Sequence, residues 1–400
     1  MTAGTPEVEG AAAKPARWSA FDEWLVRWPA GLRTGDLARV RILYASYMLL
    51  FNLPRWGWID DLPGSWYSPP PGMMPLFPAP PPGWLLDVGT VTVAVLLSAV
   101  LVGYRTRFAS VALSLVLLLG SGFAYSWGKI NHDIFLVLLP LFLAPAGWGN
   151  ALSLDARAGR TGPARRWPIT LFAVAVSLAI LSAAVPKLLS GWLSFSNEAV
   201  RGFLIRNIAV HGRDELLAEQ AAALELGLLW PLTDIIAVTL EAALIVLLFR
   251  RGWFRTGLAA LGVFHVAVLL TMNIAFTPNL ISYSVFFVWP WVGTRDTRGR
   301  VPSWAVLAGA LALALLAAGM RLTNDLSPGY ALVKAMYLPE TVVPVVLVLG
   351  LSGTLVGLDI RERLSESRRW AGGSLWPTRG ASKSGTEAAH GVHALQDEES

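Results

Sequence analysis

The stretch LDVGTVTVAVLLSAVLVGYRTRFASVALSLVLLLGSGFAYSW, residues 86–127, consists of two apolar runs separated by a short loop. Each run is close to the length of about 20 helical residues that is needed to cross about 30 Å of hydrocarbon. The loop carries Arg105 and Arg107, which belong in the aqueous phase beside a membrane. The stretch therefore predicts two membrane-spanning helices joined by a short turn.

The same pattern recurs along most of the chain, which has 400 residues, of which 54% are hydrophobic and only 15% charged. An ordinary soluble domain carries about 25% charged residues. We predict an all-α, polytopic membrane bundle with about ten transmembrane helices. They lie near residues 38–53, 86–104, 108–127, 133–148, 168–190, 228–249, 256–275, 279–293, 303–321 and 340–358, of which the first, fourth and eighth are short.

Lysine and arginine residues alternate with the predicted loops. Of the 32 in the chain, 24 lie at the two chain ends and in every second loop, and 8 lie on the other side. This asymmetry follows the positive-inside rule for an even number of spans, so both termini are expected to be cytoplasmic and the protein to lie in the cell membrane. The arginines are spread over short loops, which argues against a nucleic-acid-binding groove.

Composition and motifs exclude several kinds of site. The chain has no cysteine, so it has no disulfide, no thiolate nucleophile and no cysteine-based zinc site. The first residues lack the apolar core and cleavage site of a removable signal peptide, so the first membrane helix is expected to direct insertion. No HExxH spacing occurs, and no metal is expected.

The chain divides into four regions. Residues 1–35 form a polar, tryptophan-rich segment suited to the membrane interface, and residues 36–295 form the main membrane domain. Residues 296–360 add two helices, and residues 361–400 form a cytoplasmic tail that is predicted to be largely disordered. Between spans, the proline-rich segment 55–84 predicts a non-helical external loop, and segment 191–230 predicts external helices.

Ionisable side chains within spans cost about 2.5 to 3.5 kcal/mol each at the centre of a bilayer on insertion scales, so they need a partner or a task. Most of those in this chain fall toward the predicted external ends of the spans. They are Lys129, His132 and Asp133 (with the neutral Asn131) before the fourth span, Lys187 in the fifth, Asp234 and Glu241 in the sixth and His265 in the seventh. Their convergence predicts a site that opens to the outer leaflet.

Structural interpretations compete with this prediction. Lys187 could extend its ammonium to the interface, His132 could cap the fourth helix, and Asp234 could cap the sixth. Glu241 and His265 lie too deep to face lipid and should serve a cavity or a buried pair. A lysine in apolar surroundings loses its proton more easily and can act as a base, assisted by a histidine.

Five motifs together resemble the HTTM (horizontally transferred transmembrane) family, the membrane domain related to vitamin K-dependent gamma-carboxylase. They are LVGYRTR (101–107), NHDIFL (131–136), ALSLD (151–155), AVPKLLSGW (184–192) and FHVAVLLTMN (264–273), in the order and spacing of the family. The resemblance covers roughly residues 20–295, within the main membrane domain.

The resemblance implies that Lys187 is the base that deprotonates a quinol, of the menaquinol or vitamin K type, and that His132 belongs to the same site. We therefore take Lys187 and His132 as candidate catalytic residues. The candidate substrate-binding residues are Asn131, Trp192, Asp234, Glu241 and His265.

Two departures from the family are visible. Pro186 stands where the carboxylase has a second lysine, and a proline there changes the approach of Lys187. After residue 300 two spans and a short tail replace the large soluble domain that helps to hold the protein substrate. A small lipophilic substrate is therefore expected rather than a protein.

Two hypotheses follow. In the first, the chain is a membrane enzyme of the gamma-carboxylase type, a lyase or oxygenase acting on a quinol or another lipophilic molecule, and Lys187 and His132 face one cavity. In the second, it is a non-catalytic helper or transporter-like protein, and Lys187 is neutralised by Asp234 or another carboxylate. Of these two non-catalytic roles, transport has the weaker support, because the sequence shows no internal repeat. In both, membrane lipids surround the bundle.

Overall fold

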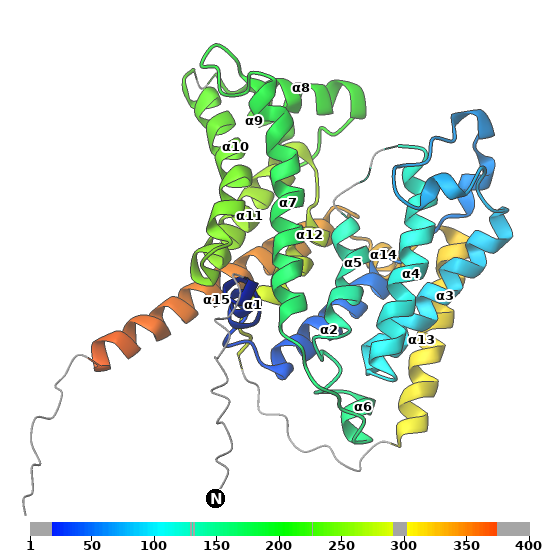
Figure 1. Cartoon of the computed structure of the whole chain (residues 1–400). Coiled ribbons are helices and arrows are strands. Elements are labelled where there is room, and N and C mark those ends of the chain that lie inside the picture. Colours follow the sequence, from blue (N-terminus) through cyan, green and yellow to red (C-terminus); the bar gives the residue numbers. More distant parts are fainter. Residues whose placement is uncertain (1–17, 129, 131–132, 226, 291–301, 374–400) are drawn as a thin grey trace, which may run out of the picture. The chain divides into compact units, whose positions relative to one another are not determined.

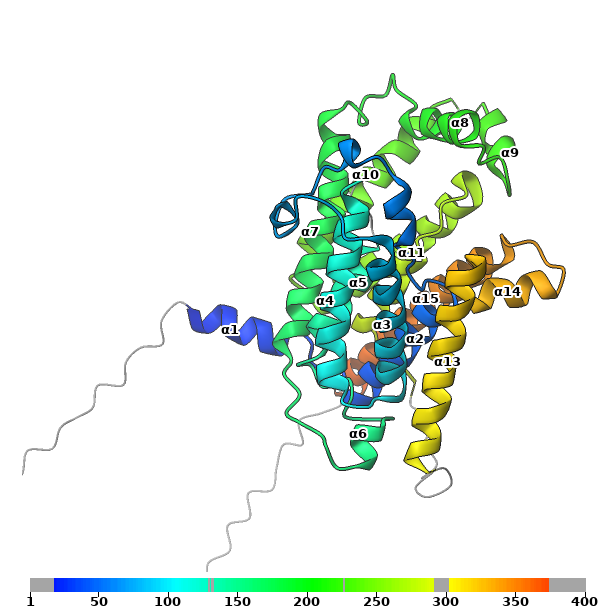
Figure 2. The same cartoon turned by 90° about the vertical axis from the view of Figure 1, so that its right-hand side faces the viewer.

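The computed structural model describes residues 18–128, 130, 133–225, 227–290 and 302–373. The chain divides into two compact units, Met1–Ile360 and Arg361–Ser400, and the contacts described below lie within the first. Throughout the described ranges the regular elements are helices, which confirms the predicted all-α membrane bundle (Figures 1 and 2). Of the predicted tail, residues 361–373 are helical, as the end of the last helix, and residues 374–400 lie outside the described residues.

Within the described ranges, seven helices are long and apolar enough to cross a membrane. They are α3 (Gly83–Val102), α4 (Thr106–Tyr125), α7 (Trp167–Leu189), α10 (Leu229–Leu247), α11 (Arg251–Met272), α13 (Ser303–Asn324) and α15 (Val342–Gly373). Helix α13 packs along α3, and α10 packs along α7. Ser352 of α15 donates to the Gly262 carbonyl of α11 at 3.0 Å, so both C-terminal helices are part of the same bundle.

The three short predicted spans form shorter elements. They are α2 (Thr34–Leu50), α5 (Ile134–Leu143), and α12 (Thr277–Tyr283) with the 3-10 turn η4 (Ser284–Phe286). A helix of ten residues is only about 15 Å long, half of a hydrocarbon layer. The prediction of ten full spans is therefore not confirmed, because α5 and α12 are too short to cross alone.

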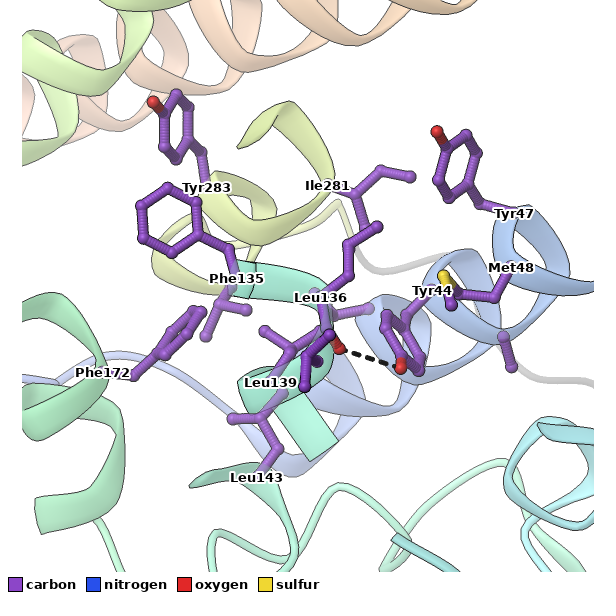
Figure 3. Close-up of a cluster of buried hydrophobic side chains, with 14 of the residues drawn as sticks. Tyr44, Tyr47, Met48, Phe135, Leu136, Leu139, Leu143, Phe172, Ile281 and Tyr283 are labelled. Atoms are coloured by element: carbon purple, nitrogen blue, oxygen red, sulfur yellow. Dashed lines mark hydrogen bonds between the residues drawn. The ribbon is translucent and has the colours of Figure 1, made fainter. Parts of the chain in front are cut away.

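Helix α5 is held in the centre of the core although Pro140 interrupts it. Proline has no N–H, so the Leu136 carbonyl lacks its partner within the helix. The Tyr44 hydroxyl of α2 donates to this carbonyl at 3.0 Å (Figure 3). The Ser114 hydroxyl of α4 likewise donates to the Val137 carbonyl at 2.7 Å. Two neighbouring helices thus satisfy the interrupted hydrogen-bond ladder.

The loops that carry the basic residues meet at one end of the bundle, where the short helix α6 (Leu154–Arg157) lies. Arg166 donates to the Pro29 carbonyl at 3.5 Å, and Arg251 donates to the Ala30 carbonyl. Asp36 accepts from the Trp289 backbone N–H at 3.1 Å. Loops that are far apart in the sequence therefore form one connected layer.

The opposite end carries α8 (Ala199–His211) and α9 (Ala218–Ala223), as both views show (Figures 1 and 2). The described part of segment 191–230 therefore contains helices, as predicted. Leu204, Ala218, Trp230 and Met272 belong to a second apolar cluster, which fixes these helices to α10 and α11. Up to the start of α3 at Gly83, the proline-rich segment 55–84 has as regular elements the 3-10 turns η1 (Gly57–Asp61), η2 (Gly64–Trp66) and η3 (Met74–Leu76).

The tryptophan-rich N-terminal segment includes α1 (Trp18–Arg27), which packs on α7. Trp28, which follows it, is buried and donates its indole N–H to the Leu248 carbonyl at 2.6 Å. The short helix α14 (Pro328–Ala335) lies between α13 and α15 in the chain and packs on α2.

Candidate functional site: an intramembrane ion pair

Lys187 and Glu241 form an ion pair between two long helices. Lys187 lies in the last turn of α7, and Glu241 lies in the middle of α10. The Lys187 ammonium is 2.5 Å and 2.7 Å from the two carboxylate oxygens of Glu241. The Lys187 side chain is 24% exposed and that of Glu241 is 11% exposed. The pair is therefore partly shielded but reachable from outside the bundle.

Trp192 covers the pair. Its backbone N–H donates to the Lys187 carbonyl at 3.3 Å, which turns the chain back after α7. The Lys187 ammonium lies 5.1 Å from the centre of the Trp192 ring, within cation–π range. Leu188 and Leu189 beside the pair are exposed, as expected for side chains that face lipid. Lys187, Glu241 and Trp192 are thus the predicted site residues that come together.

Asp234 has a different partner. It is fully buried in α10, and its carboxylate accepts from the backbone N–H groups of Ala199 and Val200 at 2.8 Å and 2.7 Å. These are the first residues of α8, so Asp234 caps α8 rather than its own helix. The expected carboxylate partner of Lys187, Asp234 or another, is therefore Glu241 and not Asp234.

His265 lies in a buried aromatic environment inside α11. Its ring stacks on Phe276 with the ring centres 4.4 Å apart, and Nε2 is 3.3 Å from the Tyr283 hydroxyl. The Asn279 amide donates to the same hydroxyl at 3.3 Å. Tyr283 thus joins His265 and Asn279 in one buried polar cluster.

Lys129, Asn131 and His132 lie outside the described residues. Their neighbour Asp133 precedes α5 and accepts from the Tyr125 hydroxyl at 2.8 Å. The assignment of His132 and Asn131 to the site therefore stays a prediction.

The motifs LVGYRTR and ALSLD meet at the opposite end of the bundle, in a cluster around Arg41 and Asp155 that we call the joint. Gly103 ends α3 in the left-handed region, and Tyr104 donates its backbone N–H to the Ala99 carbonyl at 2.9 Å, which forms a Schellman cap. Arg41 of α2 then donates to the Val100 and Leu101 carbonyls at 2.5 Å and 2.9 Å. The free carbonyls at the end of α3 are thereby satisfied.

Arg41 also joins this joint to the loop after α5. Its guanidinium is completely buried and donates to the carbonyls of Trp148, Ala151 and Leu152 at 3.2 Å, 3.4 Å and 2.5 Å. From the sequence alone, Arg41 is only one of the basic residues at the N-terminal end of the chain. Its position inside the first apolar run, at residues 38–53, was the signal that it needed buried partners.

Asp155 caps α4 from a distant part of the chain. Its carboxylate accepts from the Arg105 N–H at 3.0 Å, the Thr106 N–H at 2.7 Å and the Thr106 hydroxyl at 2.8 Å, and it pairs with Arg160 at 3.1 Å. Burial by itself would raise the pKa of Asp155, but these hydrogen bonds outweigh it, so its pKa lies below the ordinary value. Asp155 is therefore a structural anion.

Comparison with protein-family models, with curated proteins and with solved structures finds no match to this chain. The HTTM resemblance thus rests on the five motifs. Two of the five, LVGYRTR and ALSLD, form the joint around Arg41 and Asp155, and AVPKLLSGW forms the ion pair with Glu241.

The arrangement around Lys187 defines what the site can do. A lysine held by a carboxylate is a hydrogen-bond donor with a fixed position, and the carboxylate oxygens keep lone pairs that can accept a proton. In the described part of the chain, no group of three or more His, Asp and Glu side chains is close enough to hold a metal ion. The Lys187–Glu241 pair itself offers hydrogen bonding and proton exchange.

Proposed function

We propose that this chain is a multi-pass protein of the cell membrane that binds a lipophilic molecule with a hydroxylated head group, such as a quinol, at the Lys187–Glu241 pair. The observation that carries this proposal is the pair itself, partly exposed between two membrane helices and bordered by lipid-facing leucines. Ionisable residues in such positions are costly and usually serve a function. The HTTM resemblance supports the same residue, Lys187.

The pair changes the role expected for each residue. The Lys187 ammonium donates to both carboxylate oxygens of Glu241, so Lys187 as found here is a hydrogen-bond donor rather than the base that the resemblance implies. Glu241 is then the group that accepts a proton from the hydroxyl of the bound molecule. The Lys187 ammonium stabilises the oxyanion that this transfer leaves on the substrate. Trp192 offers an aromatic face against which a ring could stack.

A second candidate function, a helper protein in which the pair is structural, is favoured by the same geometry. Both carboxylate oxygens of Glu241 lie within hydrogen-bond distance of Lys187, so the lysine is neutralised without a ligand. In this case the pair joins α7 to α10 and has no further task.

Quinol binding distinguishes the two functions. The purified protein in nanodiscs should bind menaquinol or vitamin K hydroquinone, and Lys187→Ala, Glu241→Gln and His132→Ala should each weaken this binding while remaining folded. Lys334→Ala, on the exposed side of α14, serves as the control and should behave as wild type. Absence of binding in the wild-type protein would overturn the proposal and leave the structural role.

A further inference from the structure

A second possible ligand site lies on other helices, in a groove between α3 and α13. The groove has a volume of about 530 Å³, within the range of small-molecule sites. Its walls include Trp84, Val88, Val91 and Val95 of α3 and Leu322 of α13. Val88 and Val95 are also exposed on the outside of the bundle, so the groove opens toward lipid.

The length of the groove suits one hydrocarbon chain. Trp84 and Val95 are eleven residues apart on one helix, which corresponds to about 16 Å. One leaflet of a bilayer contributes about 15 Å of hydrocarbon. Trp84, which is 68% exposed, begins the groove at the first turn of α3, where tryptophan is favoured at the boundary between lipid and water.

A carboxylate marks this same end of the groove. Asp87 is one of the groove-lining residues and is partly buried. The Asp87 carboxylate lies close to the backbone of the proline-rich loop. A Cβ on Gly57 would be only 2.6 Å from Asp87 Oδ1. Asp60 approaches the start of α3 in the same way, 3.0 Å from the position of a Cβ on Gly83. The head of the groove is therefore acidic.

The described residues supply no counter-charge to Asp87. The two arginines that are close in sequence to the groove, Arg55 and Arg321, are both bound to Asp325, at 3.4 Å and 2.9 Å. In the part of the chain that the structure describes, no side chain donates a hydrogen bond to Asp87. A carboxylate at the boundary of an apolar groove is stabilised by a cation from outside the chain.

We propose that this groove binds a single-chain lipophilic amine, with the hydrocarbon chain along α3 and the ammonium at Asp87. The amine supplies the positive charge that the acidic end lacks, and its three N–H donors match carboxylate oxygens. Trp84 offers a second, cation–π contact to the same head group. An uncharged lipid would fill the apolar part but would leave Asp87 unpaired.

The test compares three probes with the same chain, namely hexadecylamine, hexadecanol and hexadecyl sulfate, by native mass spectrometry of the full chain in phosphatidylcholine nanodiscs. We expect the amine to bind about fivefold more tightly than the alcohol, as for a partly exposed ion pair, and the sulfate to bind most weakly. Asp87→Asn should remove the preference for the amine, whereas Asp61→Asn, outside the groove walls, should keep it.

A second variant tests the apolar part. Val88→Trp fills the groove and should weaken binding of both the amine and the alcohol, whereas Leu115→Trp, at a similarly exposed position on α4, should not. The thermal midpoints of all variants serve as folding controls. Equal affinity for amine and alcohol in the wild type, or an amine preference that survives Asp87→Asn, would overturn the proposal.

Discussion

The α-carbon of Gly103 lies so close to the guanidinium of Arg41 that a Cβ at this position would be 2.7 Å from Arg41 Nη1. The same Cβ would overlap the Cβ of Ser153. Gly103 also has a φ of +70°, a conformation that costs residues with a side chain about 1 kcal/mol or more. The end of α3, the first turns of α2 and the loop before α6 can therefore meet only over a glycine.

Gly103→Ala should destabilise the protein by about 2 kcal/mol or more, because strain and overlap add. Unfolding in mixed micelles with increasing denaturing detergent would measure this. The matched control is Gly309→Ala in α13, where a Cβ meets no atom within 4 Å. That variant should be neutral or slightly more stable, since alanine is the better helix former. Equal effects of the two substitutions would contradict the role of Gly103.

Arg41→Lys tests how much the buried Arg41 guanidinium contributes to the stability of the joint. Lysine keeps the charge but has three donors on one atom, so it cannot reach carbonyls on two sides as the guanidinium does. We expect a loss of about 2 to 3 kcal/mol in unfolding free energy and faster hydrogen exchange in residues 148–152, whose carbonyls lose their donors. Arg39→Lys, two residues before Arg41 on α2, is the control and should change neither.

Asp155 gives the joint a pH dependence. Because its folded pKa lies below the unfolded value of about 3.9, its contribution is fully present above that value and is lost as the pH falls through the folded pKa. Asp155→Asn should lower the free energy of unfolding by about 2 kcal/mol at neutral pH. The stability of this variant should also fall less steeply than that of wild type below about pH 4.

Asp61→Asn, at an exposed position in η1, is the comparison for this pH profile. It should follow the wild-type curve at all pH values. A parallel shift of the Asp155→Asn curve, with no change of shape below pH 4, would show that the carboxylate charge does not contribute.

The long apolar helices could be predicted because a run of about 20 apolar residues has few alternatives to a membrane span. The short segments could not, since α5 is apolar enough for a span but ends after ten residues. Pro140 interrupts its hydrogen-bond ladder, and the hydroxyl groups of Tyr44 and Ser114 donate to the carbonyls of Leu136 and Val137 there. These donors come from other helices, and the local sequence does not reveal them.

The residues of the ion pair could be predicted, but their pairing could not. Lys187 and Glu241 are 54 positions apart, and both Asp234 and Glu241 lie on the buried face of α10. Which carboxylate meets the lysine depends on how α8 packs, because the start of α8 occupies Asp234. Similarly, the motifs around Gly103 and Asp155 could be recognised in the sequence, but the sequence did not show that their residues cap helix ends.

Asp234→Ala tests the cap of α8. Removal of the carboxylate leaves the first N–H groups of α8 without acceptors, which costs about 1 to 2 kcal/mol locally. We expect trypsin to cleave faster after Arg201 and Arg206 in α8, with little change in the global midpoint. Glu198→Gln, which alters only a surface pair with Arg201 at the same helix end, should leave the cleavage rate near wild type.

Single and double substitutions at Lys187 and Glu241 distinguish an ion pair that is only structural from one whose charges bind a ligand. Lys187→Met leaves the Glu241 carboxylate in the bundle without a counter-charge, and Glu241→Leu does the same to the Lys187 ammonium, so each should cost about 3 kcal/mol. The double variant removes both charges and fills similar volume, so it should recover most of this loss. The coupling between Arg201→Met and Glu198→Leu, a more exposed pair, should stay below about 1 kcal/mol.

Function then has to be measured on the stable double variant. If it folds as well as wild type but no longer binds a quinol, the two charges are retained for the ligand, because the fold does not need them. If wild type and double variant bind equally, the pair has no part in ligand recognition. If the two single losses simply add in the double variant, Lys187 and Glu241 do not interact in the folded membrane protein, and the contact at 2.5 Å is contradicted.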